Sequence, residues 1–249
     1  MKKHKKLTIL LLFLLLTLAI AAGISFGSVN VHITDIIAAL FKKNIGSTAY
    51  ILITTVRIPR VLGGLFSGIA LSSAGVILQS VMNNSLASPN TIGVNSGSGF
   101  FVMLSMLFFP ANSALTPFAA FLGALLTTIS IFLLASLSDS SRTTIILAGI
   151  TVSTFLNAGI NTIKLLNTDL SINMTSFLIG SLSGLTMTKL ILPCAFITVA
   201  FFLTLLFARS LNILGLGDDI ARSLGLRVNL TRFFLLTLSS ILAGSVVSY

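Results

Sequence analysis

Side chains that could carry acid–base, nucleophilic or metal chemistry are few in this sequence of 249 residues. There is no glutamate, and the single cysteine, Cys194, cannot form an intrachain disulfide, so we interpret it as a small core or lipid-facing residue. The aspartates stand at or beyond the ends of the apolar stretches, at Asp35, Asp139, Asp169, Asp218 and Asp219. Carriers driven by a proton or ion gradient usually hold an ionisable group inside the membrane, and no such group is expected here.

Three nucleotide-binding or catalytic patterns are excluded. No Gly-Lys-Ser or Gly-Lys-Thr occurs, so there is no P-loop to hold ATP phosphates. A zinc-protease His-Glu-x-x-His motif needs a glutamate, which is absent. Residues 215–217 begin like a dinucleotide fingerprint, but Ile220 stands where the third glycine belongs. We therefore expect no catalytic residue, no metal site and no cofactor in this chain.

The first polar constellation is Arg57-Ile58-Pro59-Arg60, directly before a long apolar run. Proline suits the first turn of a helix, where its missing N–H would have no partner, so a helix is predicted to begin at about Pro59. The two arginines then stand at its outer end. They are either anchors at the lipid headgroups or a docking site for an acidic partner, because the planar guanidinium binds carboxylates through two bonds.

The second constellation, at 214–226, lies in the longest loop predicted on the inner side of the membrane. Asp218 and Asp219 suit the first turn of a short helix, where negative charge is favoured, and Gly225 can end it. One interpretation is a surface helix that lies on lipid headgroups. The other is a lever that an external motor protein pushes. Two acids beside Arg222 match anionic headgroups poorly, so we favour a protein partner.

Composition places these constellations in an all-α integral membrane protein. The chain is 55% hydrophobic and only 8% charged, whereas a soluble domain carries about 25% charged residues. An apolar soluble core would need charged faces that are absent. The net charge of +10 does not indicate nucleic-acid binding, because the basic residues separate apolar stretches instead of forming one face. Seven spans are predicted, at 7–26, 60–81, 91–109, 115–136, 143–166, 190–208 and 230–249, with a short, non-crossing helix at 175–186.

The basic loops predict the orientation. If the N-terminal lysines are inside, nine Lys and Arg residues lie inside and six outside, so we expect a cytoplasmic N-terminus. A cleaved signal peptide is the alternative for 7–26, but its apolar part is usually shorter. Glycines four residues apart at 64/68, 93/97 and 180/184 indicate close helix packing or the lining of a substrate path.

Five ordered segments resemble the FecCD-type permeases of ATP-binding-cassette (ABC) importers, which take up ferric siderophores, haem and vitamin B12. They are RIPR at 57–60, GIALSSAGVILQ at 68–79, NSLASP at 84–89, GVNSG at 93–97 and GDDIARSLG at 217–225. The resemblance covers essentially the whole chain. Such permeases usually have a proline where Ser85 stands, and the serine restores a backbone N–H.

The resemblance implies a ten-helix type II importer permease in the cytoplasmic membrane. Residues 1–249 would be a single transmembrane domain with about seven of these helices, incomplete at the C-terminus. A second permease copy or a paralogue would complete the path. Separate ABC ATPase subunits would bind ATP and Mg, and an extracytoplasmic binding protein would deliver the ligand. The substrate expected is an iron–siderophore complex, with haem or cobalamin as alternatives. An ion-driven secondary transporter and a non-transporting scaffold remain competing hypotheses.

The resemblance also implies roles for individual residues. Arg57 and Arg60 would dock the binding protein. The loop 210–229 would hold the cytoplasmic coupling helix, with contacts to the ATPase from Gly217, Asp218, Asp219, Ala221, Arg222, Leu224 and Gly225. The translocation path or its inner gate would be formed by Gln79, Asn83, Asn84, Leu86, Pro89, Gly93, Asn95, Ser96 and Gly97.

Overall fold

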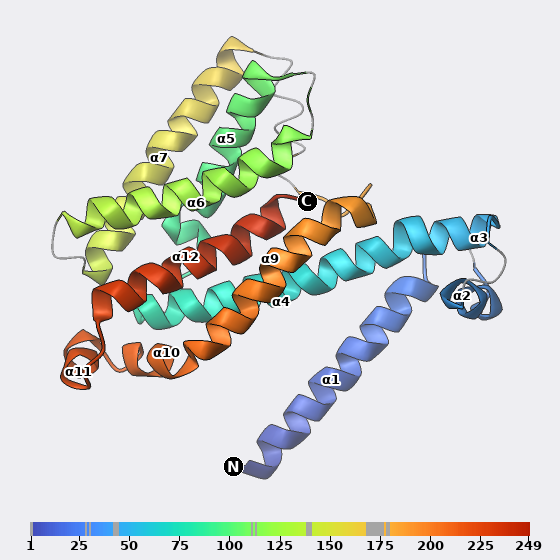
Figure 1. Ribbon diagram of the computed structural model, residues 1–249, viewed down its shortest axis with the longest axis horizontal. Helices are drawn as coiled ribbons and strands as arrows, with labels where there is room; N and C mark the ends of the chain where they lie inside the picture. The colour runs from blue at the N-terminus through green and yellow to red at the C-terminus, as the bar shows by residue number, and fades with distance from the viewer. Residues whose placement is uncertain are drawn as a thin grey trace. The chain divides into compact units, whose positions relative to one another are not determined.

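The computed structural model describes residues 2–27, 29, 31–41, 45–110, 112, 114–137, 141–167, 177 and 180–249. Every regular element among them is helical, which confirms the all-α prediction (Figure 1). The elements are α1 (Lys2–Ser25), α2 (Ile33–Leu40), α3 (Thr48–Ile51), η1 (Leu52–Arg57), α4 (Ile58–Met82), η2 (Pro89–Ile92), α5 (Val94–Phe108), α6 (Leu115–Ser136), α7 (Arg142–Leu166), α9 (Met187–Leu206), α10 (Ala208–Leu214), α11 (Asp218–Ser223) and α12 (Val228–Val247).

Six helical stretches in the described part of the chain are long and apolar enough to cross a membrane. They are Lys6–Ser25, Thr48–Met82, Leu115–Ser136, Arg142–Leu166, Met187–Leu206 and Val228–Val247. The seventh predicted span, at 91–109, is a shorter apolar helix of 15 residues, or about 22 Å at about 1.5 Å per residue. Its start is delayed because η2 is a separate 3₁₀ turn and Gly93 adopts a left-handed φ of +68°.

The α-helix α4 begins at Ile58, close to the predicted Pro59, but it is not a free helix start, because helical structure runs without a break from Thr48 to Met82 through α3 and η1. The six residues of η1 form a π-helix, and the N–H of Ile58 donates to the carbonyl of Ile53, five residues back. This wider turn directly precedes Pro59, which has no N–H to give to a regular ladder. A helix of 35 residues is about 52 Å long, more than the roughly 30 Å hydrocarbon core needs.

The short helix predicted at 175–186 is not formed over 180–186, where the backbone is irregular with a turn at 183–184. Residues 175, 176, 178 and 179 lie outside the described residues. Gly180 and Gly184 have φ values of +71° and +73°, a left-handed conformation that a helix excludes. These two glycines therefore do not form a helix-packing pair.

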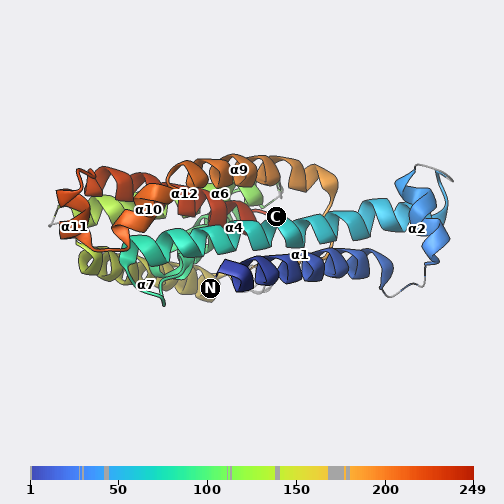
Figure 2. The same cartoon turned by 90° about the horizontal axis from the view of Figure 1, so that it is seen from below.

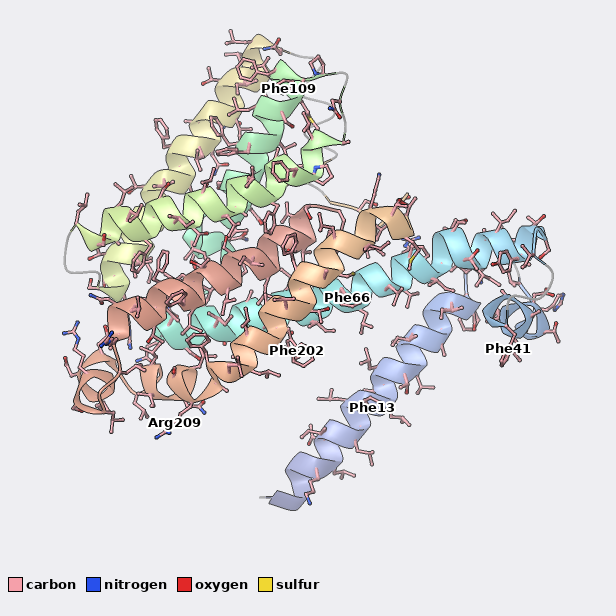
Figure 3. All side chains as sticks on the ribbon, viewed as in Figure 1. Phe13, Phe41, Phe66, Phe109, Phe202 and Arg209 are labelled. Carbon is pink, nitrogen blue, oxygen red and sulfur yellow. The ribbon has the colours of Figure 1, made fainter. Side chains whose placement is uncertain are left out.

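The described chain divides into two compact units, one of residues 1–65 with 182–190, the other of 66–181 with 191–249. In the first unit a small apolar cluster of Ile36, Ala39 and Ile53 joins α2 to η1. The side chains of α1 project from all sides of the helix, as at Phe13 (Figure 3), which is 64% exposed. An apolar helix exposed all round is suited to lipid or to a further protein surface.

The second unit is held together by α6, which lies beside both α5 and α12 (Figure 1). Small residues allow this approach. A Cβ added to Gly123 would overlap the carbonyl oxygen of Gly97 and lie 2.8 Å from Cβ of Phe101. Thr128 Oγ1 donates to Ser240 Oγ at 3.1 Å across the other contact, between α6 and α12. Close backbone packing with a few hydroxyl bonds is how helices associate in lipid.

The α5–α6 contact gives a stability prediction. We expect Gly123→Ala to destabilise the protein by about 1–3 kcal/mol, because two backbones must separate to admit the methyl group. Gly68→Ala is the matched control, since a Cβ there meets nothing within 4 Å. Thermal unfolding in detergent should show a lower midpoint for the first variant only. Equal midpoints for both variants would mean that α5 and α6 do not pack at Gly123.

Candidate functional site

A carboxylate held between two guanidinium groups lies where α10 ends and α11 begins. Asp218 is the first residue of α11. Its Oδ1 lies 2.7 Å from Nη2 of Arg142, and its Oδ2 lies 2.8 Å from Nη2 of Arg232. Arg142 begins α7, and Arg232 lies in the second turn of α12 and is fully buried. A single side chain of α11 is thus bonded to two long helices.

Two further groups complete this cluster. Arg142 also donates from Nη2 to the carbonyl of Leu214, at the end of α10, over 2.9 Å. With its amide nitrogen toward the carbonyl of Gly215, Asn83 donates there at 3.1 Å and accepts from Nη1 of Arg142 at 3.1 Å. Asn83 follows the last residue of α4. The cluster therefore joins five helices: α4, α7, α10, α11 and α12.

The charge state of Asp218 follows from these neighbours. Partial burial raises the pKa of its carboxyl group, but the hydrogen bond and charge of Arg232, together with those of Arg142, outweigh burial, so the pKa is lowered below its ordinary value of 3.8. Asp218 is consequently an anion throughout the physiological pH range.

The rest of α11 and its flanks were predicted to meet a motor protein, and most of these residues are accessible. Asp219, Arg222, Leu224 and Gly225 are exposed, whereas Ala221 is fully buried. Gly217 and Gly225 bracket the helix with φ values of +116° and +81°, which glycine adopts without strain. A hollow of about 420 Å³ beside α11 is lined by Arg222, Leu226, Arg227, Val228, Asn229 and Leu230.

The predicted gate residues separate into four groups. Gly93 and Gly97 are buried packing positions, and Asn83 belongs to the cluster around Asp218. Four others shape the turn after α4: Gln79 donates to the carbonyl of Ser85 at 3.1 Å, the Asn84 side chain accepts from the N–H of Leu86 at 2.9 Å, and Pro89 begins η2. Asn95 is exposed and Ser96 half-buried near the start of α5.

A polar face on α7 was not recognised in the sequence. Thr151, Thr154, Asn157 and Asn161 are exposed, and their spacings of three and four residues place them on one side of the helix. Asn157 Nδ2 donates to Ser96 Oγ at 3.2 Å, so this face lies beside one predicted gate residue. Amides on a membrane-length helix rarely face lipid. Their helical spacing was the signal that could have identified them.

The two arginines of the first constellation have different environments. Arg57 is only 7% exposed, and its guanidinium donates to the carbonyls of Ile24 and Ser25, the last two residues of α1, at 2.7 and 2.8 Å, and to that of Val29. A cation on these orphan carbonyls neutralises the negative end of the α1 dipole. In this structure Arg57 is therefore the C-terminal cap of α1.

Arg60, one turn further along the helix, is exposed. It borders a cavity of about 280 Å³ whose other lining residues are Thr55, Val56, Leu182, Ser183, Gly184, Leu185 and Thr186. Arg60 therefore presents its charge beside several hydroxyl groups. Asp139, Asp169, Lys42 and Lys43 lie outside the described residues. In the part of the chain that the structure describes, no three His, Cys, Asp or Glu side chains gather as a metal site would require.

The cap gives a prediction about α1. Arg57→Gln should increase hydrogen exchange over residues 22–29, because one amide cannot replace a cation bonded to three carbonyls; a hydrogen bond to a charged group contributes about 1.5–3 kcal/mol, which corresponds to at least about tenfold faster local opening. Arg60→Gln is the control and should leave the same segment unchanged. Equal protection in both variants would contradict the assigned cap.

Comparison with known proteins identifies relatives of the chain. Residues 12–249 match the model of the FecCD transport family. The Fe(3+)-citrate import system permease protein YfmD of Bacillus subtilis (strain 168) is 31% identical over 226 residues, which cover 91% of this chain and 67% of that protein. The ferric enterobactin transport system permease protein FepG of Escherichia coli (strain K12) is 31% identical over 228 residues, covering 91% and 68%.

A solved structure supports the same relation at the level of the fold. An inward-facing conformation assigned to the metal-chelate type of ABC transporter superposes with a TM-score of 0.80 at 25% sequence identity. The match covers 95% of this chain and 73% of that chain.

Proposed function

Because the chain belongs to the FecCD transport family, we propose that it is the membrane-spanning permease of an ABC importer that moves a ferric siderophore or ferric citrate complex across the cytoplasmic membrane. The observation that carries the proposal is the family match over residues 12–249, which takes in every polar constellation described above. Relatives named for Fe(3+)-citrate and ferric enterobactin support an iron chelate as substrate over haem or cobalamin.

The path would be formed by the polar face of α7 together with Asn95 and Ser96 of α5. Its groups are hydroxyls and amides, and the six membrane-length stretches contain no acidic residue. Neutral polar groups can hydrogen-bond a large hydrated chelate without holding it tightly. Such a path suits a permease whose partner protein captures the ligand and whose energy comes from outside the membrane, in an alternating-access cycle.

The exposed surfaces and the relatives support the proposed partners of the chain. ABC ATPase subunits, which would bind ATP and Mg, would contact α11 through Asp219, Arg222 and Leu224. The N-terminus and α11 would face the cytoplasm, and the binding protein would dock at Arg60 on the opposite side. Two different Bacillus subtilis relatives, YfmD and YfmE, are both named as permeases of Fe(3+)-citrate import, which supports pairing with a paralogue. Each permease of the pair would have the type II, ten-helix fold.

Transport driven by ATP is the first prediction of this proposal. The permease, its paired permease, the ATPase and the binding protein are reconstituted in proteoliposomes with a ⁵⁵Fe-loaded siderophore. We expect uptake that requires ATP and that persists when an ionophore collapses ion gradients. Uptake that continues without the ATPase but stops with the ionophore would instead indicate a secondary transporter, and partner binding without uptake would indicate a scaffold.

Docking at Arg60 is tested separately. Arg60→Glu should weaken binding of the binding protein at low salt by about fivefold, since an exposed charge pair contributes up to about 1 kcal/mol. The control is Arg209→Glu on α10 (Figure 3), an exposed arginine in the other unit of the chain. The expected difference should shrink as salt screens the charges. An unaltered affinity for Arg60→Glu at low salt removes Arg60 from the docking surface.

A further inference from the structure

Two adjacent aspartates begin α11, and their surroundings differ. Asp219 is exposed and no ion pair of its carboxylate is found among the described residues. Asp218 is partly buried and bridges Arg142 and Arg232. The same residue type at consecutive positions therefore meets two environments: one faces outward, where a partner protein can reach it, and the other faces the helices of its own chain.

The inward contact is stronger than a surface ion pair. Arg232 is fully buried, and its Nη2 lies 2.9 and 2.8 Å from the two oxygens of Asp218. A buried guanidinium is screened little by salt or water. The side chains of Asp218 and Arg142 retain only 24% and 19% of their exposure. Together the two pairs hold the first residue of α11 in a fixed position.

The two helices bonded to Asp218, α7 and α12, connect it to the proposed path. Arg142 begins α7, and fifteen residues along that helix Asn157 bonds to Ser96 at 3.2 Å. Arg232 lies in α12, which packs along α6 through the Thr128–Ser240 bond. In both Figure 1 and Figure 2, α11 lies at the same end of the second unit as the start of α12.

Ala221 packs in the apolar core, and the remaining hydrogen bonds of α11 are local. The N–H of Leu226 donates to the carbonyl of Ala221 at 3.0 Å, and that of Ala221 to the carbonyl of Gly217 at 3.0 Å. Gly217 and Gly225, both with positive φ, stand before and after the helix as flexible joints. If the backbone were the only connection, the chain would bend at these glycines when α11 moved, and α7 and α12 would stay in place.

We propose that Asp218 is a positioning residue that transmits movement of α11 to α7 and α12 through Arg142 and Arg232, while Asp219 belongs to the surface that binds the ATPase. The inference rests on the proposed function, because it divides two roles within the same importer. It predicts that the neighbouring aspartates have separable effects: loss of Asp218 uncouples ATP use from uptake, and loss of Asp219 weakens the complex.

The test compares Asp218→Asn with Asp219→Asn in the assembled importer, reconstituted with its ATPase and binding protein. For Asp218→Asn we expect ATPase affinity within about twofold of wild type and iron uptake per ATP hydrolysed lower by about tenfold or more, because both ion pairs are lost together. For Asp219→Asn we expect ATPase affinity lower by about fivefold and unchanged uptake per ATP among assembled complexes.

Asp218→Glu is the rescue variant, because it keeps the charge and lengthens the side chain by one methylene. It should recover most of the uptake per ATP. If Asp218→Asn fails to assemble, Arg142→Gln breaks one of the two pairs and leaves the buried one, and it should lower uptake per ATP by a smaller factor.

Three outcomes would overturn the inference. Asp218→Asn could weaken ATPase binding without lowering uptake per ATP, it could behave as wild type in both measurements, or, where it does not assemble, Arg142→Gln could couple normally. Failure of the proposed function is distinguishable from these, because wild-type importer would then show no ATP-dependent uptake at all.

Discussion

The arrangement depends on one buried electrostatic contact, in which Asp218 lies between Arg142 and the fully buried Arg232. A guanidinium removed from water requires an anion close by, so the position of α11 is coupled to the start of α7 and to α12. Asn83 and the carbonyls that end α10 join the same cluster. Without this contact, α11 would be a six-residue helix between two glycines with positive φ, held to the other helices by the packing of Ala221 in the apolar core and by no charged bond to α7 or α12.

The composition of the membrane-length helices explains why a charged contact at α11 would matter for transport. The six apolar stretches carry no acid that could bind a driving ion, and the polar groups of the proposed path, at 151, 154, 157 and 161 of α7 and at 95 and 96 of α5, are hydroxyls and amides. We propose that the energy for transport enters through α11, which lies outside the apolar stretches. Close packing at Gly97 and Gly123 makes α5 and α6 rigid enough to move together. Arg57 performs a different task with the same chemistry, because it caps α1.

Most spans could be predicted from sequence, because hydrocarbon admits only apolar residues whose backbone bonds are satisfied within the helix. The local backbone geometry was harder to predict. The left-handed Gly93 shortens α5, and the π-turn of η1 carries a helix through Pro59, against the usual preference. Long-range partners could not be predicted at all. Arg57 finds its carbonyls 28 to 33 residues away, and Arg142 bonds a carbonyl 72 residues away. Residue types indicated that these arginines matter, but only packing shows what each one binds.

The most direct measurement of this account is the distance between a spin label at Ser223 on α11 and one at Leu147 on α7, both exposed positions, in the assembled importer with and without ATP. If Asp218 joins the two helices, they move as one body, and the wild-type distance distribution stays narrow and unchanged when ATP binds. In Asp218→Asn the distribution should broaden or shift. A wild-type distance that changes on ATP binding would contradict the account, because α11 would then move without α7.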